Sequence, residues 1–189
     1  MSPEARWIPF TADETIDATR SSFVWNAHLD SGKINSPTVI DAYEEGHGRV
    51  TVKLGIIPLK KFGGPEVDKG EIQRYFASLV FCPSMLLNHP TLECNAAGPS
   101  ALRFQDREDP TAATVDLDLS DEGCPLASHA TRPRLVGKQS VLTPWSGIAS
   151  EFREYDGLRV ATHLEVMWHL PEGPFIYFRG ELTSFKAVR

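Results

Sequence analysis

The sequence predicts an α+β protein: a strongly curved antiparallel sheet of about ten strands, forming a half-open barrel, with one main amphipathic helix packed on its concave side. Three observations lead to this prediction. Only residues 68–87 have a clean helical period. Most other segments are short alternating runs bounded by turn residues, as strands are. A sheet of this size tends to curl, and a helix laid against it would leave a cavity of the kind that apolar ligands occupy.

The helix is predicted from one apolar stripe at i, i+3, i+4, i+7 and i+8. Its members are Ile72, Tyr75, Phe76, Leu79 and Val80. Asp68 followed by Glu71 has the spacing of a capping box, which predicts the helix start. Pro83 predicts a break, after which a second short helix would end near Leu87.

The first third of the chain is expected to be an antiparallel meander that the helix closes. Its strands are predicted at residues 5–12, 23–29, 39–43 and 48–57. Residues 44–48 have hairpin-turn composition, and the Phe62-Gly63-Gly64-Pro65 segment is expected to be a linker to the helix.

Strand patterns resume after the helix. Short strands are predicted at 91–94, 101–105 and 113–119, and a C-terminal three-strand meander at 150–155, 160–170 and 175–185. Asp156-Gly157 between alternating runs is a strong hairpin signal, whereas Pro133 leaves residues 129–136 ambiguous. No linker or repeat separates these parts, so a single domain over residues 1–189 is expected.

The composition narrows the classes of partner and compartment. Hydrophobic residues make up 41% of the chain and the net charge is −6, which argues against nucleic acid or an anionic membrane as partner. Cys82, Cys94 and Cys124 have no metal-binding spacing and are expected to be buried free thiols, as in a reducing compartment. No apolar stretch approaches the ~18 residues of a membrane span, so a cytoplasmic protein is expected.

Several ordered landmarks resemble a bacterial family of domains of unknown function. They extend over nearly the whole chain and comprise Arg6-Trp7-Ile8-Pro9-Phe10, Phe23-Val24-Trp25-Asn26-Ala27, Asp41-Ala42-Tyr43, Gly46-x-Gly48, Arg74-Tyr75-Phe76-Ala77, Pro83-x-x-Leu86-Leu87, Pro144-Trp145-x-Gly147, Tyr155-Asp156-Gly157, Glu165-x-x-Trp168 and Tyr177. The resemblance implies no particular activity. It also suggests a shape similar to the curved-sheet lipoprotein carriers of the LolA/LolB type.

The chain departs from this family pattern at two helix positions. Ser78 stands where the family usually has glutamate, and Phe81 where it usually has tryptophan. The missing carboxylate would lie at i+4 from Arg74, so Arg74 needs another partner, for which Glu71 at i−3 is the nearest choice on the helix. These changes suggest a pocket adapted to a particular ligand.

No motif for a cofactor or a metal ion is present. Neither a G-x-S-x-G elbow nor a G-x-G-x-x-G loop occurs, and Cys82 before Pro83 is expected to be a buried small apolar residue rather than a nucleophile. His163, Glu165 and His169 share a strand face, but the two histidines would lie about 20 Å apart, too far for one metal ion. We therefore expect no cofactor.

General acid–base chemistry remains open. Glu165 and His163, with the Ser78 hydroxyl and Arg74, are the candidate catalytic residues, because a buried carboxylate beside an apolar substrate is how a cofactor-independent isomerase or cyclase would work. The alternative is that Glu165 pairs with Arg153 or Arg179 on a neighbouring strand and orders the sheet.

Aromatic residues are the candidate substrate-binding set. They are Trp25, Tyr43, Tyr75, Trp145, Trp168 and Tyr177. The tryptophans could belong to the core alone or line a pocket, since both roles suit large rings with one polar atom.

The hypothesis favoured by the sequence is binding of a hydrophobic small molecule between sheet and helix. Within it, a cofactor-independent cyclase or isomerase is preferred, acting by positioning and acid–base chemistry. A carrier without turnover and a partner-binding module that uses a sheet edge are the alternatives.

Overall fold

The computed structural model describes residues 6–30, 32, 35–81, 89–107 and 113–188. Within these residues the chain has twelve strands in two antiparallel sheets and one α-helix. Chain contacts divide the protein into two compact units, residues 1–75 and residues 76–189. The α+β class with antiparallel sheets and one helix is thus confirmed, but the strands form two sheets rather than one sheet of about ten. The single domain stays a prediction.

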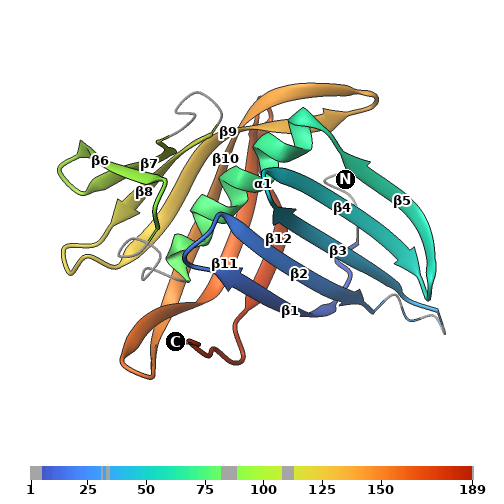
Figure 1. Ribbon diagram of the computed structural model, residues 1–189, viewed down its shortest axis with the longest axis horizontal. Helices are drawn as coiled ribbons and strands as arrows, with labels where there is room; N and C mark the ends of the chain where they lie inside the picture. The colour runs from blue at the N-terminus through green and yellow to red at the C-terminus, as the bar shows by residue number, and fades with distance from the viewer. Residues whose placement is uncertain (1–5, 31, 33–34, 82–88, 108–112, 189) are drawn as a thin grey trace. The chain divides into compact units, whose positions relative to one another are not determined.

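The first unit contains a five-stranded meander in the order β1-β2-β3-β4-β5, coloured blue to cyan in Figure 1. The elements of this unit are β1 (Phe10–Asp17), β2 (Ser22–Leu29), β3 (Pro37–Glu44), β4 (His47–Leu54), β5 (Ile57–Gly63) and helix α1 (Pro65–Ala77), whose last turn crosses the unit boundary. β5 is a strand that the sequence did not predict, because its two lysines, its proline and its glycine are poor strand formers. β1 begins later than expected and runs to Asp17.

Helix α1 begins at Pro65, three residues before the predicted start. The backbone N–H groups of Val67 and Asp68 donate to the Gly64 carbonyl, which opens the first turn. Proline suits this first helical position because its missing N–H would have no partner there. The Asp68 carboxylate accepts the Gly48 N–H (2.7 Å) from strand β4, so the capping-box interpretation was wrong and Asp68 joins helix to sheet.

The apolar stripe of the helix is confirmed as core. All five residues that predicted it are buried, Ile72 and Tyr75 in the first unit and Phe76, Leu79 and Val80 in the second. The last two belong to a 3-10 turn, η1 (Ser78–Val80). The predicted break at Pro83 and the second short helix lie outside the described residues.

The second unit contains a seven-stranded meander in the order β12-β11-β10-β9-β8-β7-β6. Its strands are β6 (Leu92–Gly98), β7 (Ala101–Asp106), β8 (Thr114–Leu119), β9 (Pro125–Val136), β10 (Gln139–Tyr155), β11 (Leu158–Leu170) and β12 (Gly173–Glu181). The C-terminal three-strand meander is confirmed. β10 begins at Gln139, eleven residues before the predicted start at residue 150.

The two faces of this second sheet differ in chemistry. Residues that lie opposite each other in antiparallel strands point to the same face. One face carries Phe104, Val115, Leu117, Trp145 and Val166, all buried. We call this the apolar face, and the opposite one, which carries the ion pair of Arg103 with Asp116, the polar face.

Candidate functional site

Arg74 is the centre of a cluster on the helix-covered face of the first unit. One of its terminal nitrogens donates to Asp41 and the other to Glu14 (3.1 Å). The guanidinium carbon also lies 4.6 Å from the ring centre of Phe23 and 5.2 Å from that of Trp25. We call these five residues the arginine cluster. These two acidic partners lie on β3 and β1, where strand register brings them to Arg74. The pairing with Glu71 stays a prediction.

Two of the predicted substrate-binding tyrosines border this cluster and are buried. Tyr75 is fully enclosed and donates its hydroxyl to the backbone oxygen of Asp17 (2.8 Å). Tyr43 lies opposite Phe23 in the β2–β3 register and is also buried. The structure therefore places Trp25, Tyr43, Tyr75 and Arg74 in one region of the first unit, with the two tyrosines buried and Trp25 packed on Arg74.

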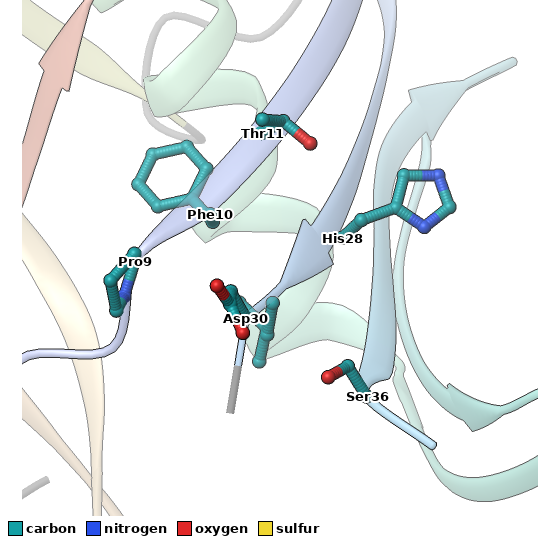
Figure 2. A pocket seen from close by; sticks show the side chains of 7 residues that line it. Pro9, Phe10, Thr11, His28, Asp30 and Ser36 are labelled. Atoms are coloured by element: carbon teal, nitrogen blue, oxygen red, sulfur yellow. The ribbon is translucent and has the colours of Figure 1, made fainter. Parts of the chain in front are cut away.

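A pocket of about 320 Å³ lies at one end of the same sheet (Figure 2). It is lined by Pro9, Phe10, Thr11, His28, Leu29, Asp30 and Ser36. The first three lie at the start of β1, the next three at the end of β2, and Ser36 directly precedes β3. The pocket combines an apolar wall with hydroxyl, imidazole and carboxylate groups. None of its residues was among the predicted site residues, because they are adjacent only through strand pairing.

Hydrogen bonds and ring packing fix the walls of this pocket. The Asp30 N–H donates to the Pro9 carbonyl (2.7 Å) and closes the β1–β2 end. The Asp30 carboxylate accepts the Gly32 N–H (3.0 Å). Phe10 packs edge-on against Trp25 of the arginine cluster, with ring centres 5.8 Å apart. A ligand would thus meet a wall already held in place.

The second unit holds a separate aromatic cluster on its apolar face. Trp145 and Trp168 lie opposite each other in the β10–β11 register. The Trp145 indole N–H donates to the Tyr177 hydroxyl (2.8 Å), and the Tyr177 ring stacks on Trp168 at 5.7 Å. The Arg132 guanidinium, also buried, lies 4.8 Å from the Trp145 ring centre. The predicted residues Trp145, Trp168 and Tyr177 are therefore brought together.

Glu165 and His163 lie on the polar face of the same sheet, opposite to that cluster. Both are an odd number of positions from Trp168 along β11, which pairs regularly with β10 over this stretch. Glu165 accepts a hydrogen bond from Arg179 (2.7 Å), its partner in the β11–β12 register. This is one of the two pairings considered as the alternative to catalysis.

An irregularity in β12 lets Tyr177 contact Trp168 on one face of the sheet and Arg179 contact Glu165 on the other. The β11–β12 register shifts at Val166/Met167, so that Tyr177 has no opposite residue. Strict alternation would put Tyr177 and Arg179 on the same face. The extra residue, a β-bulge, lets Tyr177 reach Trp168 while Arg179 reaches Glu165.

The other predicted catalytic residue, Ser78, is buried in η1.

The polar face of the second sheet also holds Ser146, only 1% exposed, which shares a hydrogen bond with His169 (2.8 Å). Cys82 lies outside the described residues.

Three groups with a shifted pKa, in Asp17, Cys94 and Asp116, belong to neither the arginine cluster nor the aromatic cluster. The hydrogen bond from Arg103 lowers the pKa of Asp116. The hydrogen bonds from the Thr19 side chain and backbone lower the pKa of Asp17. Partial desolvation raises the pKa of the Cys94 thiol, but the residue is exposed, so the expectation of a buried cysteine was wrong here. In the described part of the chain, no three His, Cys, Asp or Glu side chains gather as a metal site would require. Over the same residues, no helix has the length and apolarity to cross a membrane.

The comparisons with known proteins agree with the resemblance noted in the sequence. A family model described as "Family of unknown function (DUF6544)" matches residues 1–180. No curated protein and no solved structure matches the chain.

Proposed function

Since the chain belongs to the DUF6544 family, whose function is unknown, we propose from its own geometry that it binds a small, mainly apolar molecule. The ligand would sit in the pocket at the end of β1 and β2. The pocket of about 320 Å³ is the observation on which this proposal rests. Its volume is near the lower end of the range of about 300–1,000 Å³ that is usual for small-molecule sites.

The lining of the pocket suits an apolar body with one polar group. Pro9, Phe10 and Leu29 supply apolar surface, and the side chains of His28 and Asp30 can donate or accept hydrogen bonds. Because Phe10 packs against Trp25, little side-chain freedom would be lost on binding. The strong curvature that the sequence predicts for a sheet of about ten strands around the helix is untested, and for the β1–β5 sheet it is part of this proposal.

Binding without turnover is the version that we favour. The side chains first considered for catalysis have other partners: Glu165 is held by Arg179, and Arg74 by Asp41 and Glu14. A carboxylate engaged in this way is a poor general base. The second candidate is a cofactor-independent isomerase or cyclase acting in the same pocket, because an imidazole, from His28, and a carboxylate, from Asp30, are in its wall.

Native mass spectrometry after exposure to a cell extract tests the proposal. We expect a small-molecule adduct on the wild-type protein that is lost in Leu29→Trp, whose indole would fill the pocket. Leu142→Trp is the matched control, because Leu142 is an exposed leucine on a strand of the other unit. Circular dichroism should show that both variants fold.

The outcomes separate the hypotheses. An adduct retained in both variants would refute the pocket as the site. A molecule released unchanged supports a carrier, whereas release of a compound altered from its precursor, with the alteration absent in Asp30→Asn, supports an enzyme. If no adduct forms, small-molecule binding is refuted, and the partner-binding module predicted from the sequence becomes the leading hypothesis.

A further inference from the structure

The hairpin formed by β4 and β5 has an apolar tip. Its strands close at the pair Leu54–Ile57, and Gly55, with φ of +59°, makes the tight turn possible. Ile56 at the turn is 95% exposed, and Ile57 and Leu59 are 62% and 55% exposed. Three large aliphatic side chains therefore project into solvent within four residues.

Other hairpins of the same chain have polar turns, as hairpins usually do. Residues between β3 and β4 are Glu45-Gly46, and those between β10 and β11 are Asp156-Gly157. Turn chemistry alone therefore does not require isoleucine at position 56. An exposed isoleucine in a turn is unfavourable in water unless something covers it.

The charge around this tip is opposite in sign to that of the protein. The net charge of the chain is −6, yet residues 46–65 contain no Asp or Glu. The two strands of this hairpin carry three lysines, Lys53, Lys60 and Lys61. The hairpin is therefore a local cationic element with an apolar end, which the net charge conceals.

Protection of an edge strand explains only part of this pattern. β5 is the edge of its sheet and all seven of its residues are exposed. Lysines and an irregular register, both present here, are common devices that stop edge strands from pairing with other chains. Exposed isoleucines have the opposite effect, since they favour association. Edge protection does not account for Ile56 and Ile57.

We propose that the β4–β5 hairpin docks on an anionic lipid bilayer. Ile56 and Ile57 enter the boundary between headgroups and acyl chains, while Lys53, Lys60 and Lys61 interact with lipid phosphates. A cationic element with an apolar tip is complementary to such a surface in both charge and polarity.

Docking would also bring the pocket close to the bilayer. Leu54 at the tip lies opposite Pro37, and Ser36, the preceding residue, lines the pocket. The hairpin and the pocket therefore share one end of the sheet. Bilayer docking does not depend on ligand binding, and the two proposals are tested by different measurements.

Vesicle co-sedimentation tests the docking. The purified full chain is mixed with vesicles of phosphatidylcholine alone or of phosphatidylcholine with phosphatidylglycerol. We expect binding to the anionic vesicles that weakens as salt is raised, because salt screens the lysines. Ile56→Ser should weaken binding about tenfold. Lys60→Gln/Lys61→Gln should weaken it about 25-fold, at about fivefold per lysine.

Matched variants control for general effects of charge and apolar surface. Leu126→Ser removes an exposed aliphatic side chain of the other unit, and Lys69→Gln/Lys186→Gln removes two lysines elsewhere. Neither should change binding by more than about twofold, the size expected of nonspecific surface charge. Absence of binding to anionic vesicles, or equal losses in test and control variants, would overturn the proposal. So would concentration-dependent dimerisation that Ile56→Ser abolishes, because the tip would then bind a second copy of the chain.

Discussion

Gly48 is the residue where the helix and the sheet of the first unit approach each other most closely among the glycines described. A Cβ at this position would lie 2.7 Å from the backbone oxygen of Val67 and 2.9 Å from Cγ of Glu71. The Gly48 N–H also donates to the Asp68 carboxylate (2.7 Å). Gly48→Ala must therefore displace the start of α1 or bend β4, and either movement stretches that hydrogen bond.

The cost can be worked from these contacts. A carbon–oxygen contact at 2.7 Å is shorter than real Cβ atoms show, and the atom in the way is backbone, which cannot rotate aside. Overpacking of this kind costs about 1–3 kcal/mol. Loss of the charge-assisted hydrogen bond adds about 1 kcal/mol or more. The free energy of unfolding should therefore fall by about 2–4 kcal/mol.

Urea denaturation followed by tryptophan fluorescence measures this loss. Gly63→Ala is the matched control, because Gly63 is a strand glycine of the same sheet whose added Cβ would have only one neighbour, at 3.6 Å. It should change the free energy of unfolding by less than about 0.5 kcal/mol. If Gly48→Ala were no more destabilising than Gly63→Ala, the close approach of helix and sheet would be refuted.

Three further predictions concern polar contacts. Arg74→Met leaves two partly buried carboxylates without their cation, and should lower the free energy of unfolding by about 2–3 kcal/mol in the same denaturation assay. Tyr177→Phe removes the acceptor of the Trp145 N–H and should cost about 1–2 kcal/mol by that assay. Asp116→Asn should destabilise the protein at neutral pH, because Arg103 stabilises the carboxylate. Since the pKa of Asp116 is lowered on folding, this difference should disappear in a pH series as the pH falls below about 4 and through the folded pKa.

Each of these predictions has a matched control. Arg49→Met breaks an ion pair with Glu44 that is largely exposed, and should cost about 0.5 kcal/mol. Equal losses for Arg49→Met and Arg74→Met would contradict the special role of the arginine cluster. Tyr155→Phe, where the ring contact is with Phe185, should be nearly neutral, and an equally large loss there would count against the indole–phenol bond. A stability difference for Asp116→Asn that persists at pH 2 would refute the titration argument.

Local patterns in the sequence were enough for the elements that follow a simple period. The stripe from Ile72 to Val80 predicted a buried helical face, and alternation around Asp156-Gly157 predicted the C-terminal hairpin. The alternative to catalysis named Arg153 or Arg179 on a neighbouring strand as the partner of Glu165, and the register supplies Arg179. In each case the residues that determine the structure lie within a few positions of one another or on neighbouring strands.

Contacts that join distant segments were not predictable in the same way. Arg74 has its partners 33 and 60 positions away, on β3 and β1, whereas the sequence suggested a neighbour on the helix. The pocket likewise depends on three chain segments that meet only when the sheet pairs. The first eleven residues of β10 were likewise not predicted as strand, although they include Pro144, which pairs with Thr131 in the sheet. Tertiary register overrides local propensity at these positions.

The bulge at Tyr177 has a consequence for the evolution of the family. At the bulge, Tyr177 faces the side of the sheet that carries Trp168. Two residues later, Arg179 faces the opposite side, where Glu165 lies. If β12 paired with β11 without the bulge, Tyr177 and Arg179 would face the same side of the sheet, and only one of the two contacts could form. Deletion of Tyr177 should therefore remove the ring that stacks on Trp168 and leave Arg179 opposite Glu165, so a relative with a gap at this position can still keep the cross-strand arginine.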